Sequence, residues 1–504
     1  MKVWFSSAVN TIPNNYVLRL FSRHPGRLVY LMMGLSFLFI YMAISRQSIW
    51  IDEAITATYA MQSSFTSFAR EMWTTRQSEA QLPLGMAQAF LFEKILGNSE
   101  FALRLPNLFW IGLGIIAFGR IGSKLKLPWI PLLIGVHPMI WFYADEARPY
   151  AMQIGIAAIM LWASIEMLLS NRIEGKTLAL WWIASFALCA SSLMAAVVYT
   201  GWFLTLAYNV RSKIPSMTAK SRTGSLITLL LLSFLAVYYC VTVYRGAGGS
   251  RLWGVGLRNI AFTAFEFGGF MAFSPGRAVI REAARQNPTD LFEVMRYYIL
   301  PLFLLAAIYC TLLASFLLAA RKSALPHAKL LGFCLQTIAI CTIIVLSICM
   351  IVNFPFWGRH LVALLPPLLL VIALAIDAVH QRYKTILLMV FLGFLLAGSL
   401  NQRFNSQHRK DDYRYAVQVA QEAEAEQLAV LWVANIQAAN YYQYEPTLSY
   451  RSMNDRQDWR EADLVIYSKP DIFDPNGKIT RWMHASGFEP YKTWPAFSLW
   501  RKSP

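Results

Sequence analysis

Long apolar stretches separated by short polar loops make up most of the chain between residues 28 and 400. A helix that crosses a bilayer needs about 20 predominantly apolar residues, and several of these stretches approach that length. The pattern therefore predicts a polytopic α-helical membrane protein. Twelve apolar runs can be marked, at residues 28–46, 82–97, 105–121, 127–143, 150–169, 177–191, 193–210, 224–244, 297–320, 329–352, 360–379 and 384–400.

The basic residues of the short loops limit how many of these runs cross the membrane. Cytoplasmic loops of membrane proteins carry an excess of Lys and Arg. The basic loops alternate regularly along the chain, and the N-terminal segment is basic too, so an even number of crossings must separate that segment from the first basic loop. The basic short loops are residues 122–126, 171–176, 211–222, 321–329 and 380–384.

The run 82–97 violates this parity if it crosses the membrane. It is short, and its second half carries Glu93 and Lys94, which are costly in lipid. We therefore expect 82–97 to form a helix at the membrane surface. About eleven spans then remain, with the N-terminus in the cytoplasm and the C-terminus on the outer side.

The predicted spans divide the chain into three regions. Residues 1–27 form a basic cytoplasmic tail without a small-residue cleavage site, which distinguishes it from a signal peptide. Residues 28–400 form the membrane domain, with large outer loops at 47–104 and 245–296. Residues 401–504 contain helical and strand patterns, among them "LAVLWVA" and "ADLVIYS" as strands, and predict a small α/β domain outside the membrane.

The amino-acid composition is typical of a membrane protein and gives no indication of a nucleic-acid partner. The chain is 57% hydrophobic and only 14% charged, whereas soluble domains carry about 25% charged residues. The net charge of +17 lies largely in the N-terminal tail and the inner loops, and the C-terminal region has equal numbers of acidic and basic residues. The excess therefore does not indicate nucleic-acid binding. All six cysteines lie in apolar runs and predict neither disulfides nor a metal site.

Charged residues gather where the outer loops meet the membrane. Asp52 and Glu53 stand where the chain leaves the first predicted span. The stretch "YADEARPYAM" then places Asp145, Glu146 and Arg148 in a short connection between two spans. These two clusters lie on the same predicted side of the membrane, so we expect them to form one site.

A third outer cluster, "NFPFWGRHLVALLPPL", places Arg359 and His360 at the mouth of a late span. Arginine near a span end can simply extend its charge to the membrane surface, and His360 is more often structural than catalytic in such a place. The large outer loop 245–296 adds Arg251, Trp253, Arg258, Arg277 and Arg281.

Acids and arginines at a membrane surface suit the transfer of a sugar from a lipid-linked phosphate to a hydroxyl group. One carboxylate can act as the general base on the acceptor hydroxyl. Arginine stays charged and binds phosphate oxygens with two parallel donors. The leaving phosphate is a weak base, so no second carboxylic acid is needed to protonate it, in contrast to glycoside hydrolysis.

At this point the residues resemble a known family. The Asp-Glu pair after the first span, "LGNSEFALRLPNLFW", "EARPYAM", "GRHLVALLPPL" and "DDYRYAVQVA" occur in this order. The chain is similar to the GT-C polytopic glycosyltransferases, and within them to the protein O-mannosyltransferases and the lipid A aminoarabinose transferase (glycosyltransferase family 39-like). The resemblance covers roughly residues 28–415 and is strongest over 48–152.

The resemblance implies a GT-C fold in a bacterial inner membrane, a polyprenyl phosphate sugar as donor, and a periplasmic active site in which Asp52 is the catalytic base. The acceptor would be an envelope glycan, a lipid such as lipid A, or a protein. Candidate catalytic residues are Asp52, Glu53 and Glu146; candidate donor-phosphate ligands are Arg148, Arg359, His360 and Arg251; candidate substrate contacts are Tyr150, Gln81 and Trp253.

Each assignment has a simpler alternative. Asp52 could only cap a helix that begins at Glu53 and runs over about 53–63, because Asp is a favoured N-cap residue. Glu53 is the next residue along a helix and cannot face the same way as Asp52, so it supports the site rather than acting as a second base. Arg148 could be an interfacial anchor, and Glu146 could position the acceptor or pair with Arg148.

A metal is not expected. Many relatives have a His before the Pro at the head of the surface helix, where this chain has Gln81 in "EAQLPLG", and Gln is a poor metal ligand beside His. We therefore predict no cofactor, although the acids at 52, 53 and 146 could still bind a divalent ion.

Two other function classes remain open. A secondary transporter or lipid-linked sugar flippase usually has ionisable groups near the middle of the membrane and internal repeats, and neither is visible in this sequence. A GT-C-like scaffold without activity would only bind a lipid-linked sugar or a partner. The sequence does not identify the sugar, the acceptor or the oligomeric state.

Overall fold

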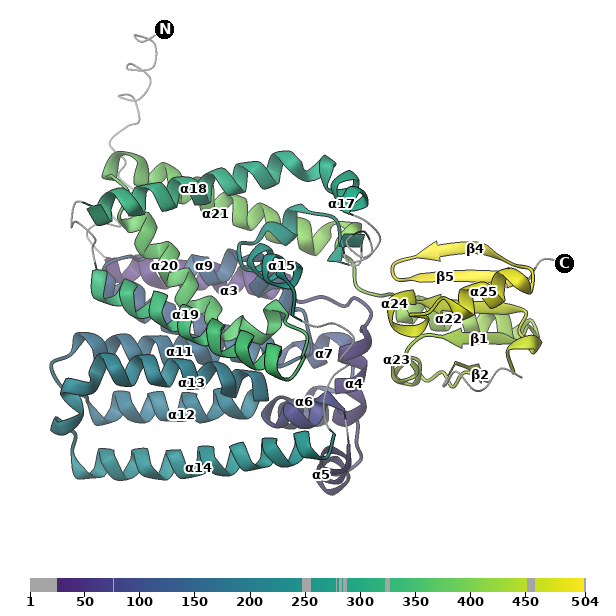
Figure 1. Ribbon diagram of the computed structural model, residues 1–504, viewed down its shortest axis with the longest axis horizontal. Coiled ribbons are helices and arrows are strands. Elements are labelled where there is room, and N and C mark those ends of the chain that lie inside the picture. The colour runs from purple at the N-terminus through teal and green to yellow at the C-terminus, as the bar shows by residue number, and fades with distance from the viewer. Residues whose placement is uncertain are drawn as a thin grey trace, which may run out of the picture.

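The computed structural model describes residues 25–75, 77–246, 255–277, 279–280, 283, 288–321, 327–450 and 458–502. In these ranges nine helices are long and apolar enough to cross a membrane. They run side by side in one bundle, and the C-terminal α/β domain lies at one end of it (Figure 1). The predicted fold class, a polytopic helical membrane protein with a small C-terminal α/β domain, is confirmed.

Most predicted spans match a single helix of the bundle. Because each is apolar on nearly all sides, it suits the interior of a bilayer better than the surface of a soluble protein. The long helices are α3 (Pro25–Ala43), α8 (Pro106–Leu125), which continues α7 (Glu100–Arg104), α11 (Tyr150–Leu169), α13 (Leu193–Val210), α14 (Ala219–Tyr244), α18 (Ile299–Arg321), α19 (Ala328–Ile351), α20 (Leu365–Asp377), which continues η5 (Gly358–Leu364), and α21 (Gln381–Phe404).

Two of the expected spans differ from this pattern. The run 177–191 forms α12 (Gly175–Ser191), which at 17 residues is slightly shorter than the nine long helices. The run 127–143 is broken into α9 (Ile130–Val136) and α10 (Pro138–Ala144). The break has a local cause, because Pro138 has no backbone N–H and disfavours helical geometry at His137, which is extended with φ −77° and ψ 124°.

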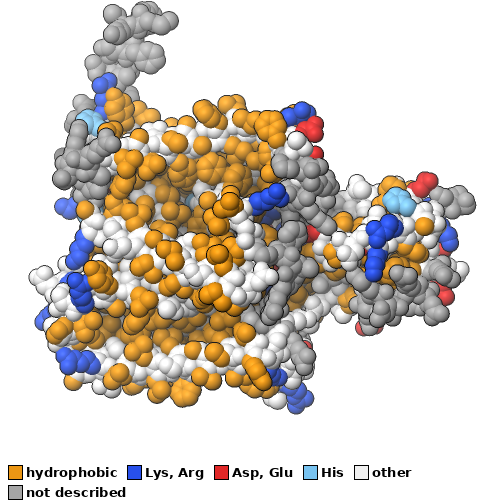
Figure 2. Space-filling model, viewed as in Figure 1, with side chains coloured by type: hydrophobic (Ala, Val, Ile, Leu, Met, Phe, Trp, Pro, Cys, Tyr) orange, Lys and Arg blue, Asp and Glu red, His pale blue; other side chains and the backbone are white. Residues whose placement is uncertain are grey.

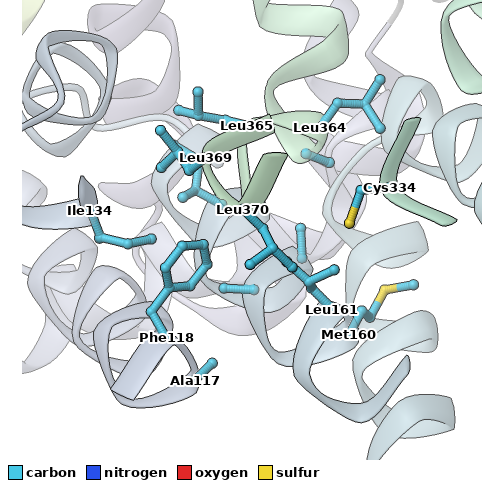
Figure 3. Close-up of a cluster of buried hydrophobic side chains, with 14 of the residues drawn as sticks. Ala117, Phe118, Ile134, Met160, Leu161, Cys334, Leu364, Leu365, Leu369 and Leu370 are labelled. Carbon is cyan, nitrogen blue, oxygen red and sulfur yellow. The ribbon is translucent and has the colours of Figure 1, made fainter. Parts of the chain in front are cut away.

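Small residues allow the central helices to approach closely. Gly155 of α11 lies against the backbone of Trp110 in α8, where a Cβ atom would overlap the Trp110 carbonyl oxygen. Gly114 of α8 faces the backbone of Gly155. Close backbone contact at small residues is a main source of helix association in lipid. The bundle centre is filled by apolar side chains, including Phe118, Ile134, Leu161, Leu369 and Leu370 (Figure 3).

Short helices cover the end of the bundle that faces the C-terminal domain. The run 82–97, which we expect at the membrane surface, corresponds to α6, whose 14 residues begin at Pro83, a favoured first helical residue. The short elements of this and the other connections are α4 (Ile51–Ala60), α5 (Phe65–Thr74), η1 (Ser78–Gln81), α6 (Pro83–Leu96), η2 (Arg211–Ser216), α15 (Leu257–Phe267), η3 (Phe270–Phe273), α17 (Pro288–Met295), η4 (Arg296–Tyr298) and η6 (Ser406–His408).

The C-terminal region folds around a five-stranded sheet of order β2-β1-β3-β5-β4. β1 pairs in parallel with β2 and β3, while β5 is antiparallel to β3 and β4. The two sequence-predicted strands are β1 and β3. The elements are α22 (Tyr413–Ala425), β1 (Val430–Val433), α23 (Ile436–Tyr441), β2 (Leu448–Ser449), η7 (Asp458–Glu461), β3 (Leu464–Ser468), α24 (Pro470–Phe473), α25 (Lys478–Ala485), β4 (Phe488–Trp494) and β5 (Phe497–Lys502).

The C-terminal region docks on α4. Ile49 and Ala54 are fully buried in the same apolar cluster as Tyr413 and Trp432. The backbone N–H of Ile49 also donates a hydrogen bond to the hydroxyl of Tyr442 at 3.0 Å. On the face shown in Figure 2, apolar side chains cover the bundle, and Lys and Arg lie at its two ends.

Candidate active site

Glu53 lies at the centre of a buried ion-pair network. Its side chain is fully buried and accepts hydrogen bonds from Arg104 Nε at 2.8 Å and Arg104 Nη2 at 2.7 Å. The backbone N–H of Ala147 donates to Glu53 Oε1 at 2.8 Å, and Lys410 Nζ lies 3.2 Å from both carboxylate oxygens. Burial alone would raise the pKa of Glu53, but Arg104 and Lys410 lower it to about 2. Glu53 is therefore a fixed anion that holds four segments together.

Arg104 and Asn107 hold the neighbouring chain segments in place. Arg104 Nη1 donates to the carbonyl oxygens of Ser45 and Gln47, at 3.3 and 2.9 Å. Asn107 Nδ2 donates to the carbonyl oxygens of Ala144 and Glu146, at 3.1 and 2.5 Å. The stretch "LRLPNLFW" thus supplies one donor for the segment after α3, Arg104, and one for the loop after α10, Asn107.

Asp145 belongs to the same network and has a structural role. Its carboxylate accepts hydrogen bonds from the backbone N–H and the hydroxyl of Ser45, at 2.6 and 2.8 Å. Arg104 lies 3.9 Å and Lys410 3.8 Å from this carboxylate. These contacts tie the end of the first span to the loop before α11.

Asp52 has a different environment from Glu53. It lies in the first turn of α4, which begins at Ile51 rather than at Glu53, so Asp52 is not the N-cap residue that we considered. Its side chain is 23% exposed and pairs with Arg359 Nη1 at 3.0 Å. Burial raises the pKa of Asp52, but the charges of Arg148, Arg359 and Lys469 outweigh it and hold the pKa below its ordinary value.

Arg148 is buried and pairs with an acid that the sequence analysis did not select. Its Nη1 donates to Glu79 Oε1 at 2.7 Å and to Thr56 Oγ1 at 3.3 Å. Glu79 is itself buried. The alternative in which Arg148 pairs with Glu146 is therefore wrong. Among the residues that the structure describes, the Nε of Arg148 is buried and has no hydrogen-bond partner.

Glu146 is a buried carboxyl group that forms no ion pair with a described residue, although Lys410 and Arg277 are near enough to act on its pKa. Its side-chain Oε2 has no hydrogen-bond partner among the described residues. Burial raises the pKa of Glu146 to about 7; the charges of Glu53 and Asp52 add to this effect, while Lys410 and Arg277 oppose it. A carboxyl group that titrates near neutral pH can both accept and return a proton.

Arg277 and Glu266 complete the charged surroundings. Arg277 pairs with Glu266 at 2.9 Å and lies over the ring of Phe142, 3.6 Å from its centroid. Burial raises the pKa of Glu266, and Arg277 and Arg359 reduce that rise. Gly358 allows Glu266 to approach Arg359, because a Cβ atom on Gly358 would overlap the Glu266 carboxylate.

The remaining predicted residues lie in several different places. Tyr150 is buried at the start of α11, near Arg148 and Arg359. Gln81 lies half-buried at the end of η1, two residues after Glu79. His360 accepts a hydrogen bond from the backbone N–H of Trp357 at 3.3 Å, which suits the structural alternative. Arg251, Trp253 and Arg281 lie outside the described residues.

The structure thus brings Asp52, Glu146, Arg148 and Arg359 to one end of the bundle, and it adds residues that sequence reasoning missed. Arg104 and Glu79 stood in quoted motifs or beside them, but a buried ion pair between distant residues leaves no local pattern. Lys410 and Lys469 come from the C-terminal region. Lys469 pairs with Asp411 at 2.5 Å and lies over the ring of Trp50, 5.4 Å from its centroid.

Among the described residues, no group of three or more His, Cys, Asp or Glu side chains is placed to hold a metal ion. Asp52, Glu53 and Glu146 are each within reach of Arg or Lys charges instead. Metal independence stays a prediction.

No protein-family model matches the chain, and no curated protein matches it. Solved structures do match. ArnT from Cupriavidus metallidurans in the apo state is 11% identical, with a TM-score of 0.51 over 94% of this chain and 99% of that chain. ArnT from the same organism bound to undecaprenyl phosphate is 12% identical, with a TM-score of 0.49 over 95% and 98%. Arabinofuranosyltransferase AftD from Mycobacteria is 13% identical, with a TM-score of 0.40 over 95% of this chain and 40% of that chain.

The apo ArnT match shows that the chain has the fold of this transferase over nearly its whole length. The resemblance to GT-C glycosyltransferases is thereby confirmed at the level of the fold.

Proposed function

We propose that this protein is a membrane glycosyltransferase that moves a sugar from a polyprenyl phosphate to an acceptor hydroxyl group. The observation that carries the proposal is Asp52, a partly exposed carboxylate beside Arg359 and Arg148 at the end of a membrane bundle. A carboxylate and cations in one place supply both a proton acceptor and a phosphate site. The ArnT fold supports the same class.

In the proposed reaction the acceptor oxygen attacks the anomeric carbon of the sugar. A new carbon–oxygen bond forms there, and the bond between that carbon and the phosphate oxygen breaks. The polyprenyl phosphate leaves with the electron pair, and the acceptor proton passes to Asp52. Arg148 and Arg359 stabilise the negative charge that grows on the phosphate.

Arg359 would change partners when the donor binds. It now pairs with Asp52 at 3.0 Å, and a donor phosphate would compete for the same guanidinium group. Loss of that ion pair raises the pKa of Asp52 and makes it a stronger base. Donor binding therefore prepares the base, and Asp52 stays a weak base in the free protein.

Glu146 is the alternative base. Its pKa of about 7 is well suited to proton transfer at neutral pH, but it is only 2% exposed. Asp52 is more accessible to an acceptor that arrives from outside the bundle. We therefore assign the base role to Asp52, and Glu146 stays the second candidate.

We place the protein in a bacterial inner membrane with the site on the periplasmic side. The support is the charge of the short loops, because residues 122–126, 171–176, 211–222, 321–329 and 380–384 are basic and alternate along the chain. The donor would then be an undecaprenyl phosphate sugar or a related polyprenyl phosphate sugar. The acceptor would be an envelope glycan, a lipid or a protein.

The test is turnover by the purified protein in detergent with a radiolabelled undecaprenyl phosphate sugar and envelope extract. We expect release of undecaprenyl phosphate together with labelled acceptor. In sealed vesicles, movement of intact donor across the bilayer without transfer would support a flippase instead. Donor binding without either event would indicate an inactive scaffold. Arg359→Gln is expected to weaken donor binding, and Arg382→Gln on exposed α21 serves as the control.

A further inference from the structure

A basic cavity lies beside the candidate active site, at the junction of the bundle and the C-terminal region. Its volume is about 420 Å³. It is formed by the segment after α3, the end of α21 and the chain that leads into α22. The lining residues that matter for charge are Arg46, Arg403, Arg409, Lys410, Arg414 and Asp412.

Three of the five cations have no acidic partner in the described chain. Lys410 is taken by Glu53 and Asp145, and Arg414 pairs with Glu100. Arg46, Arg403 and Arg409 form no ion pair with a described residue; Arg46 lies over the ring of Phe101 and Arg403 over that of Phe404. With Asp412 as the single lining acid, the cavity retains a surplus of about two positive charges. This surplus matches the charge of a phosphate monoester.

The cavity also opens beside surface that is suited to lipid tails. Arg403 Nε donates to the carbonyl oxygen of Met42 at 3.3 Å, so the ends of α3 and α21 lie together at the cavity. Next to it, Phe404 is 61% and Tyr41 is 53% exposed. Both helices belong to the nine that can cross a membrane. Charged groups at such a helix end meet the headgroup layer, where Arg and Lys attract anionic lipids.

From this arrangement we infer that the cavity is a binding site for the phosphate-bearing headgroup of a membrane lipid, with the lipid tails along α3 and α21. Arg46, Arg403 and Arg409 hold the phosphate, and the side chains of Ser45, Gln47 and Ser48 line the same cavity. This lipid is distinct from a donor at Arg148 and Arg359, because neither of these arginines lines the cavity. The inference does not depend on the proposed transferase activity.

Lys410 connects the cavity to the candidate active site. It lines the cavity and also contacts Glu53, and its charge opposes the rise in the pKa of Glu146. An anion in the cavity attracts Lys410 away from the two glutamates. Lipid occupancy is therefore coupled to the protonation of Glu146.

Native mass spectrometry of the full-length protein in detergent tests the inference, with phosphatidic acid as probe and phosphatidylcholine as the neutral comparison. We expect the intact chain to retain phosphatidic acid preferentially. The double variant Arg403→Gln, Arg409→Gln should lose at least about tenfold in affinity, because each change removes a charged donor that binds the phosphate. Arg382→Gln, at the opposite end of α21, should bind as the unmodified protein does.

Three results would overturn the inference. Equal retention of the two lipids would show that the cavity does not select phosphate monoesters. Unchanged binding in the double variant, or equal loss in Arg382→Gln, would place the lipid elsewhere. If inorganic phosphate at millimolar concentration displaces the lipid completely and binds with the same dependence on Arg403 and Arg409, the site is one for free anions and not for a lipid. Thermal unfolding of each variant checks that it is folded.

Discussion

Asp52 and Glu53 point in different directions from the first turn of α4, and their surroundings differ accordingly. Asp52 is partly exposed and faces Arg359, whereas Glu53 is enclosed by Arg104, Lys410 and the Ala147 backbone. Their spacing along a helix was sufficient to predict that the two acids diverge. It was not sufficient to predict the partners, because Arg104 and Lys410 lie 51 and 357 residues away along the chain.

Replacing Asp52 separates catalysis from structure. Asp52→Asn keeps the size of the side chain and removes the proposed proton acceptor, and loss of a charge in the first turn of a helix costs only about 0.3–1 kcal/mol. Turnover should fall by about 10² to 10⁴-fold, while donor binding persists or tightens because Arg359 is released. Sugar-transfer rates and donor affinity, measured on the same preparation, check this. Near-normal transfer would move the base to Glu146.

Glu53→Gln should destabilise the protein in neutral and alkaline solution. The folded-state pKa of about 2 lies below the ordinary value of 4.5, so the ionised group contributes stability above pH 4.5, and this is lost as the pH falls through 2. The shift corresponds to about 3 kcal/mol. The midpoint of thermal unfolding at pH 8 should therefore drop. An unchanged midpoint would mean that the Glu53 network is not important for stability.

Glu146→Gln should stabilise the folded protein at neutral and alkaline pH, in contrast to Glu53→Gln. The pKa of Glu146 is raised from 4.5 to about 7, so the folded state favours the protonated group, and its contribution is lost as the pH rises from 4.5 through 7. The variant should unfold at a higher temperature than the unmodified protein at pH 8, and at nearly the same temperature at pH 4.5. A lower midpoint at pH 8 would show that ionised Glu146 has a partner in the folded protein.

Among the elements, the apolar runs predicted the helices well. A helix that crosses a membrane is determined by one continuous apolar segment and needs few contacts with distant parts of the chain. Pro138 is visible in the sequence, but it lies inside an apolar run that is long enough to cross a membrane. The run was therefore predicted as one continuous span, whereas the helix breaks at His137. The start of α4 was placed two residues late, since Trp50 and Ile51 carry no capping signal. The strands β1 and β3 were found because both are short continuous apolar runs, whereas the edge strand β2 has only two residues.

The close contact between α8 and α11 predicts that a larger residue at Gly155 destabilises the protein. Gly155→Ala would place a methyl group against the Trp110 carbonyl oxygen and force the two helices apart. Overpacking of this kind costs about 1–3 kcal/mol, so the midpoint of thermal unfolding should fall. Gly34→Ala on α3 is the matched control, because no atom lies within 4 Å of its added methyl group. Equal effects of the two changes would argue against close packing at Gly155.

For the whole molecule, the orientation in the membrane rests on loop charge and on the parity of the spans. A reporter fused after residue 125 should be cytoplasmic, and one fused at the C-terminus should be periplasmic. Alkaline phosphatase and green fluorescent protein fusions distinguish the two sides. A cytoplasmic C-terminus would mean that residues 82–97 cross the membrane, although α6 has only 14 residues. The residues of the proposed site would then not all lie on the same side of the membrane.

Lys410 and Lys469 follow α21, the last of the nine long helices, so the ribosome adds them after every membrane segment has been made. Until then the Asp52 carboxylate lacks one of its cations and Glu53 lacks its lysine. A partly synthesised chain therefore carries an unfinished site. If the proposed function holds, translation itself delays transfer until the C-terminal region has been made and has docked on α4.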